Sequence, residues 1–261
     1  MRLLAWLLTW TPLWLASGLC HGLSWLWWIV LPVRKSVAVD NLRHALPELP
    51  HGPTLRAAFA SLALGIVELL QLRRNKVSLT FHGDPGLLER GLSGQASLFI
   101  GCHSAGFEAA THLFAQQVPS AAFVRPPRQE SAKVLMEELR GALQTLPPHG
   151  SMAQGYAAIS QGKTLMFALD QRRAEGIPVD FFGRPAWTSP AVAVAALRTG
   201  LPVYGGWIRR SAPGVLHAHV ARIELEGDIE RDTQRMSDWM EAHVRREPGS
   251  WLWLHDRWRR P

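Results

Sequence analysis

The chain has 261 residues, enough for one sizeable α/β domain with an appendage, and its formal net charge is +7 at pH 7. Its 2 Cys residues do not indicate a disulfide framework, and no Gly-rich phosphate loop, Walker pattern, Cys-x2-Cys pair or internal repeat occurs. The positive charge indicates an anionic partner, and 12 Trp residues crowded toward the two ends favour a membrane over nucleic acid, because indole rings settle at the bilayer interface.

The N-terminal segment is unusually apolar. No charged residue occurs in Leu3–Val33, which is longer than the ~20 residues that a membrane-spanning helix needs. It also exceeds the ~7–15 apolar residues of a cleaved signal peptide. Pro12 and Gly18 interrupt the run, so a kinked span and a helix lying in the interface both remain open.

The sequence thus predicts two parts, a membrane anchor at residues 1–35 and a folded domain at residues 36–261. Arg34 and Lys35 follow the apolar run directly. Because basic residues are retained on the cytoplasmic side, we expect the domain to lie on that side of the membrane.

Two helices are predicted next. Residues 36–52 indicate a short helix and a Pro-rich turn, and Pro53–Arg74 indicates a helix with proline at its start. Apolar residues recur at helical spacing in the second, which is typical of a helix facing the core. Glu68 interrupts them; a carboxylate at the rim is the expectation, and a buried partner for a base is the alternative.

The central motif is Ser97–Phe114, in which a short apolar strand leads through a tight turn into a helix. His103 falls where the strand ends, the usual place for a site in open α/β sheets. Glu108 follows in the first turns of the helix and is expected to fold back on His103. A carboxylate on one imidazole nitrogen would leave the other free as a general base. His-x4-acid spacing arises about once by chance in such a composition, so the placement carries the inference.

Polar side chains follow two further strands. Arg125 ends the predicted strand 122–124, at the same sheet edge as His103, where it is either a grip for an anionic group or a solvated surface residue. Asp170 and Gln171 follow the strand Lys163–Leu169 and are candidate substrate-binding residues.

The remaining pattern alternates helices and extended segments. We predict helices at 129–140, near 151–160, at Ala191–Thr199 and at Asp232–Val244, and extended segments at 179–183, Leu201–Ile208 and Val215–Leu225.

His217 and His219 share a strand face, but without a third ligand two exposed imidazoles are expected and no metal site. Cys102 and His103 point to opposite faces of a strand, which argues against a thiol dyad.

In this order the motifs resemble a known family, the late acyltransferases of lipid A biosynthesis, a lauroyl/myristoyl transferase group within the lysophospholipid acyltransferase superfamily. The resemblance covers nearly the whole chain. Its motifs are Asp40-Asn41-Leu42, Gly101-x-His103-x4-Glu108, Val124-Arg125-Pro126, Asp170-Gln171, Phe181-Phe182-Gly183 and Trp251-Leu-Trp253-Leu-His255-x-Arg257-Trp258.

The resemblance implies a fold, a reaction and a location. The fold is a glycerolipid acyltransferase-like mixed sheet flanked by helices, preceded by an N-terminal membrane-anchoring helix. The reaction moves a fatty acyl chain from acyl carrier protein to a hydroxyl of a glycolipid such as a lipid A precursor. His103 and Glu108 take the family's catalytic positions, and no cofactor, metal or nucleic acid is involved. The location is the bacterial inner membrane, on its cytoplasmic side.

Some expectations remain open alongside the family's chemistry. The helix N-terminus near His103 is expected to keep the imidazole neutral. Trp251 and Trp253 either contact the membrane or pack under the sheet. The alternative functions are an acyltransferase for a lysophospholipid or another lipid, and a non-catalytic membrane-anchored lipid-binding protein.

Overall fold

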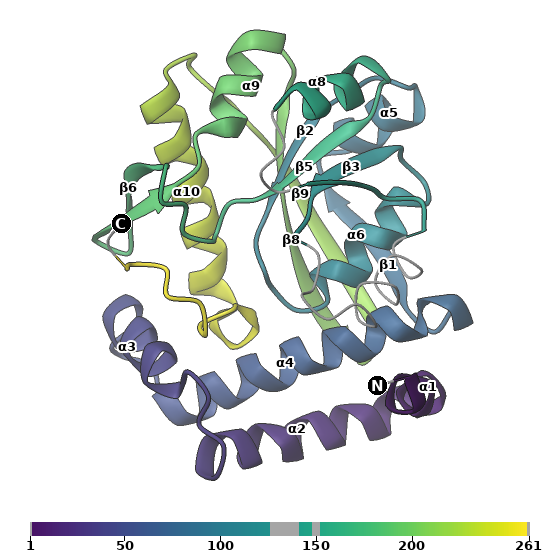
Figure 1. The fold of residues 1–261 in the computed structure, drawn as a ribbon, viewed down its shortest axis with the longest axis vertical. Coiled ribbons are helices and arrows are strands. Elements are labelled where there is room, and N and C mark those ends of the chain that lie inside the picture. Colours follow the sequence, from purple (N-terminus) through teal and green to yellow (C-terminus); the bar gives the residue numbers. More distant parts are fainter. Residues whose placement is uncertain (1, 126–140, 148–151, 260–261) are drawn as a thin grey trace.

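The structure is a computed structural model that describes residues 2–125, 141–147 and 152–259. Within these residues one mixed sheet has the strand order β1-β9-β8-β2-β5-β3-β4, and β6 and β7 form a separate hairpin (Figure 1). The strands are β1 (Ser78–Gly83), β2 (Leu98–Gly101), β3 (Ser120–Phe123), β4 (Gln144–Leu146), β5 (Thr164–Ala168), β6 (Ile177–Phe181), β7 (Arg184–Thr188), β8 (Val203–Ala212) and β9 (Val215–Ile223). The helices are α1 (Arg2–Trp10), α2 (Leu13–Ile29), α3 (Lys35–Ala45), α4 (His51–Gln71), α5 (Gly86–Leu92), α6 (Phe107–Ala115), α8 (Met152–Ser160), α9 (Ala191–Thr199) and α10 (Ile229–Arg246), with short 3-10 turns at Leu72–Arg74 and Pro248–Ser250.

The predicted α/β class, a mixed sheet flanked by helices, is confirmed. β2 pairs in parallel with β5 and β8, whereas β8 and β9 form an antiparallel hairpin. The predicted helices and strands recur with small shifts at their ends, and α9 ends as predicted at Gly200, whose φ is +67°. The predicted helix at 129–140 lies outside the described residues.

The sheet has a different core on each face because side chains alternate along a strand. Leu98 and Ile100 of β2 are fully buried in one core, together with side chains of α9 and α10. Phe99, between them, packs into the other core with Leu87 of α5 and Phe114 of α6. The second face is the one that carries the site described below.

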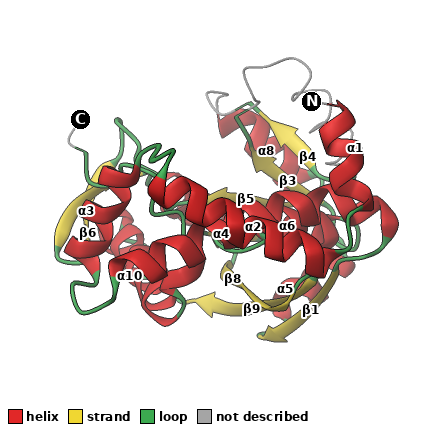
Figure 2. Cartoon of the chain, turned by 90° about the horizontal axis from the view of Figure 1, so that it is seen from below, coloured by secondary structure: helices red, strands yellow, loops and turns green. Residues whose placement is uncertain are grey.

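The N-terminal segment differs from the expected single anchoring helix. The chain breaks at Pro12, so α1 has 9 residues and α2 has 17, and α2 lies along α4 (Figures 1 and 2). Among the described residues, the helix long and apolar enough to cross a membrane is His51–Arg74, and 61% of that apolar stretch is buried in the protein. The break between α1 and α2 falls at Pro12, because proline lacks the N–H needed inside a helix.

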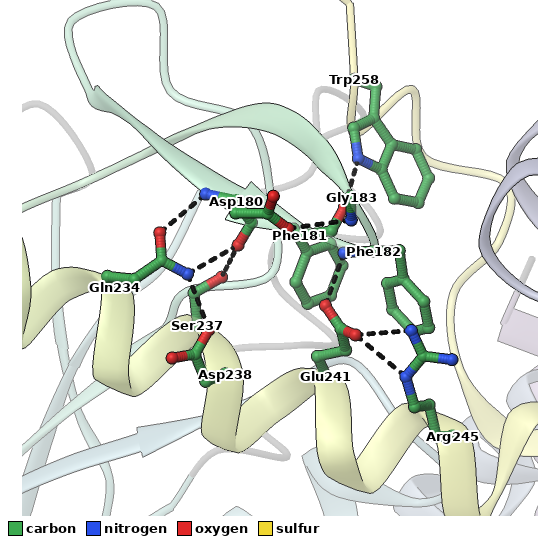
Figure 3. Close-up of polar contacts among 10 residues, drawn as sticks. All are labelled: Asp180, Phe181, Phe182, Gly183, Gln234, Ser237, Asp238, Glu241, Arg245 and Trp258. Atoms are coloured by element: carbon green, nitrogen blue, oxygen red, sulfur yellow. Dashed lines mark hydrogen bonds and ion pairs between the residues drawn. The ribbon is translucent and has the colours of Figure 1, made fainter.

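The β6–β7 hairpin is fastened to α10 by polar side chains (Figure 3). Phe182 and Gly183 both have positive φ, +56° and +74°, as a tight two-residue hairpin turn requires. For the bulky Phe182 this conformation costs about 1–3 kcal/mol. Glu241 offsets that cost by accepting the Phe182 N–H at 2.5 Å, and Gln234 bonds both backbone groups of Asp180 at 2.7 and 2.9 Å.

Candidate active site

The site is built where β2 and β5 end. Gly101 of β2 is paired in parallel with Ala168 of β5, so the next residues on that face, His103 and Asp170, leave their strands side by side. His103 Nδ1 lies 2.7 Å from Asp170 Oδ1, and the His103 backbone N–H donates to Asp170 Oδ2 at 2.8 Å. The sheet register therefore brings together two residues that are far apart in the sequence.

The contacts of Asp170 fix the tautomer of His103. Trp251 Nε1 is a third donor to this carboxylate, at 2.9 Å from Oδ2. An ionised carboxylate only accepts hydrogen bonds, so the proton of His103 lies on Nδ1 and the lone pair of Nε2 is available to a substrate. The exposed fraction of the His103 side chain is 21% and that of Asp170 is 2%, so only the imidazole is open to a substrate.

The two groups shift each other's pKa. Burial lowers the pKa of His103, but the charge and hydrogen bond of Asp170 outweigh it, with a further contribution from Glu108, so the pKa is raised above its ordinary value. Burial raises the pKa of Asp170, but His103 and the other donors hold it below its usual range. This upward shift of the His103 pKa opposes the effect expected from the helix N-terminus, because the adjacent carboxylate favours the imidazolium.

The orienting carboxylate also differs from the expected one. Asp170, which was expected to bind substrate, accepts the hydrogen bond from Nδ1, and Glu108 lies in the first turn of α6, where it lines the cavity beside His103. Gln171 Nε2 faces His103 Nε2 at 3.3 Å. Asp170, Gln171 and His103 therefore form one hydrogen-bonded group, and Glu108 acts on it through its charge.

A cavity of about 870 Å³, lined by both apolar and polar residues, opens beside His103. Its walls come from the α5–α6 face of the sheet and from those two helices, while Arg125, Arg173 and Glu175 are among its polar lining residues. Arg125 is exposed. The predicted candidates His103, Glu108, Arg125 and Gln171 thus all line one cavity, as their positions after neighbouring strands predicted.

The C-terminal segment forms hydrogen bonds to both Asp170 and His103. Besides the bond from Trp251 to Asp170, the Leu252 N–H donates to the His103 carbonyl oxygen at 3.1 Å. Asn41 of α3 holds the segment in place by donating to the carbonyls of Trp253 and His255 at 2.8 and 2.7 Å. Trp251 and Trp253 are 1% exposed, which decides their two interpretations in favour of packing inside the protein.

A buried ion pair lies under the turn that carries His103. Arg210 donates from Nε and Nη2 to the two carboxylate oxygens of Glu68, at 2.7 Å each, and from Nη1 to Ser61 Oγ at 2.7 Å. Glu68 is completely buried, so the expected rim position is wrong, and its buried partner is the Arg210 cation. A Cβ on Gly106, whose φ is +64°, would lie 2.8 Å from Glu68 Oε2, so this turn needs glycine.

Cys102 and the pair His217 and His219 are the other candidates that the sequence raises. Burial raises the pKa of the Cys102 thiol, so it is not a thiolate nucleophile, as the strand geometry predicted. His217 Nδ1 meets His82 Nε2 at 2.9 Å, yet the described residues contain no group of three or more ligating side chains suited to a metal ion.

Sequence reasoning missed three supporting residues, namely Asn41, Trp251 and Leu252. Asn41 and Trp251 stand in motifs of the family resemblance, so the signal for them was present. Their partners were not visible, because each contact joins segments separated by more than 80 positions.

A base beside a cavity lined mostly by apolar residues suits an enzyme that moves a fatty acyl group, because the base serves the nucleophile while the cavity encloses the chain. Residues 2–260 match the family of bacterial lipid A biosynthesis acyltransferases. The chain belongs to this family, as its motifs predicted, and is an acyltransferase.

Two further comparisons add little. The chain is similar in structure to the 1-acyl-sn-glycerophosphate (LPA) acyltransferase PlsC from Thermotoga maritima, with 12% identity, a TM-score of 0.43 and coverage of 90% of this chain and 94% of that one. A similarity at this level supports no argument about the site. No curated protein sequence matches the chain.

Proposed function

We propose that this acyltransferase moves a fatty acyl chain from acyl carrier protein to a hydroxyl of a membrane glycolipid such as a lipid A precursor. The observation that carries the proposal is His103, held by Asp170 at 2.7 Å, with Nε2 facing the Gln171 amide in the wall of the cavity. Family membership supports the glycolipid acceptor.

The proposed reaction proceeds through His103. The acceptor hydroxyl displaces the Gln171 amide from Nε2, and Nε2 takes the hydroxyl proton as its oxygen attacks the thioester carbonyl. Asp170 stabilises the imidazolium that forms. When the tetrahedral intermediate collapses, the carrier thiolate leaves and receives the same proton. The side-chain amide of Gln171, at 3.3 Å from Nε2, is a suitable donor to the oxyanion.

The charges around the mouth suit an anionic donor. Arg125 and Arg173 line the cavity, and the whole chain has a formal charge of +7. Acyl carrier proteins are acidic, so long-range attraction would speed their encounter with this protein.

The N-terminal helices suit attachment to the cytoplasmic face of the bacterial inner membrane. Among the described residues, all but three of the large apolar side chains that are exposed lie between Leu3 and Val33. Cations flank three of the Trp rings, as is common where a protein meets lipid headgroups. These pairs are Arg74 over Trp10 at 4.1 Å, Arg56 over Trp25 at 3.7 Å and Lys35 over Trp28 at 4.0 Å. The pattern favours helices lying in the interface over a span.

The test is acyl transfer by the purified full chain, with acyl carrier protein as donor and a lipid A precursor in detergent as acceptor, analysed by mass spectrometry. His103→Ala should reduce transfer about 10²–10⁴-fold while the folded state persists, because a general base is lost but little packing. A variant that keeps more than a tenth of the activity would refute the role of His103. Transfer only to a lysophospholipid would reject the glycolipid acceptor and leave the base in place.

A further inference from the structure

The floor of the cavity is formed by residues paired across neighbouring strands, and two successive rows of such pairs differ in side-chain size. In the row directly below His103, Gly101 of β2 is paired with Ala168 of β5, and a Cβ on Gly101 would lie 3.4 Å from the carbonyl oxygen of Gly206 of β8. Across three neighbouring strands this row offers almost no side chain. An acyl chain that starts at His103 can therefore lie directly on the backbone of the sheet.

The next row is bulky. Phe99 is paired with Met166 of β5 on one side and with Tyr204 of β8 on the other. Phe99 lies on the same strand face as Gly101 and His103, four residues or ~13 Å before His103. It is only partly buried, whereas its neighbours Leu98 and Ile100 are fully buried on the opposite face.

The ring of Phe99 leans from its own row onto the glycine row. A Cβ on Gly206 would lie 2.3 Å from Phe99 Cζ, so the ring occupies the space that any side chain at position 206 would need. The ring also stacks on Phe114 of α6, with centroids 6.3 Å apart and planes at 21°. Beyond it the cavity continues to β1 and β9, where its lining includes Phe81 and Val220.

We propose that Phe99, seated on Gly206, sets the length of the acyl chain that the cavity accepts, by narrowing the route from the floor below His103 to the space lined by β1 and β9. This inference rests on the proposed function, because it takes the cavity ligand to be the fatty acyl group. Gly206 makes the arrangement possible by leaving room for the ring.

The test varies chain length and the two residues together. Wild type, Phe99→Ala, Phe99→Leu and Gly206→Ala receive an equimolar mixture of acyl carrier proteins loaded with decanoyl to octadecanoyl chains, and the product masses give the preference. Phe99→Ala should shift it toward longer chains, with a change of about tenfold in the ratio of kcat/KM for the two lengths at the boundary. Phe99→Leu should give a smaller shift in the same direction. It replaces Phe99→Ala as the test if the alanine variant does not fold.

Gly206→Ala should shift the preference toward shorter chains, because the new methyl group pushes the ring into the channel. In the Phe99→Ala background the same substitution should have no effect, since the ring it would displace is gone. Phe59→Ala is the matched control, because Phe59 stacks on Trp27 at 4.8 Å between α2 and α4 and does not line the cavity. An unchanged preference in folded Phe99→Ala and Phe99→Leu overturns the inference.

A second measurement separates this inference from the proposed function. Free fatty acids of the same lengths are added to each variant, and the gain in thermal stability is followed against chain length. The length at which the gain stops increasing should rise in Phe99→Ala and fall in Gly206→Ala. If no variant transfers acyl chains to the lipid A precursor but this pattern is seen, the proposed function fails and the role of Phe99 stands; an unshifted pattern refutes that role.

Discussion

At the scale of single residues, the orientation of His103 decides what the site can do. Its Nδ1 is bound to Asp170 at 2.7 Å, and Glu108 acts on it by charge from the first turn of α6. The two carboxylates therefore contribute differently, Asp170 through a hydrogen bond and its charge and Glu108 through its charge.

Asp170→Asn should reduce the rate at pH 8 by as much as about 10⁴-fold, because an amide can hold the imidazole in the wrong tautomer, as the same change does in Ser-His-Asp triads. Glu108→Gln is the matched variant, and a much smaller loss is expected from it if its contribution is electrostatic alone. Steady-state kinetics of both variants, with the fold checked by circular dichroism, give the comparison. Equal losses would show that Glu108 also orients His103 or contacts substrate.

The pH dependence gives a second prediction at this scale. The base works only as neutral imidazole, and the pKa of His103 is raised, so kcat/KM should fall with decreasing pH through a midpoint above the ordinary value of about 6.5. Without the charge of Asp170, burial dominates and lowers the pKa, so the residual activity of Asp170→Asn should have its midpoint at lower pH. A pH–rate profile from pH 5 to 9 measures both, and an unmoved midpoint in the variant would contradict the coupling.

Arg125 lies exposed at the mouth of the cavity and is proposed to contact an anionic group of donor or acceptor. Arg125→Lys should raise KM for that substrate with little change in kcat, because an ammonium group lacks the bidentate fit of guanidinium to phosphate. Kinetics with donor and lipid varied separately identify which substrate is contacted. Unchanged constants for both would identify Arg125 as a solvated surface residue.

At the scale of elements, α4 supports the turn that carries His103. The ion pair of Glu68 with Arg210 joins α4 to β8 beneath Gly106, with side-chain exposed fractions of 0% and 11%. Burial of this kind makes the loss of one partner costly, because the other charge stays inside the protein.

Glu68→Gln should therefore lower the free energy of unfolding by about 3–5 kcal/mol in denaturant titrations. The control is Glu224→Gln at the exposed pair with Arg222, where exposed fractions of 74% and 52% limit the effect to about 1 kcal/mol or less. Similar values for the two variants would mean that the buried pair adds nothing beyond a surface contact.

At the scale of the whole molecule, the exposed apolar side chains gather on one part of the surface, around α1 and α2. α2 packs Ala16 and Cys20 against α4, buries Trp27, and leaves most of its other large apolar side chains exposed. Deleting the segment would uncover α4, so substitutions test membrane binding more cleanly than truncation does.

Leu19→Glu together with Leu23→Glu, at side chains that are 57% and 46% exposed, should weaken binding to anionic phospholipid vesicles by more than about tenfold. The thermal stability should hardly change, since neither side chain belongs to the core. Leu197→Glu on α9, at 56% exposure, is the control and should bind as wild type does. Vesicle sedimentation measures the partition, and equal binding by all three proteins would exclude α2 from the contact.

The sequence alone determined the α/β class, the bounds of most helices and strands, the family and the position of His103. It could do so because these features depend on local patterns: apolar periodicity, turn residues and motif order. The tertiary structure decided which carboxylate orients His103, that Arg210 is the partner of Glu68, that Trp251 lies inside the protein and that the N-terminal run forms two helices beside α4. The physical reason is sheet register and helix packing, which join Asp170 to His103 across 67 positions and Arg210 to Glu68 across 142. No spacing within a local motif contains those contacts.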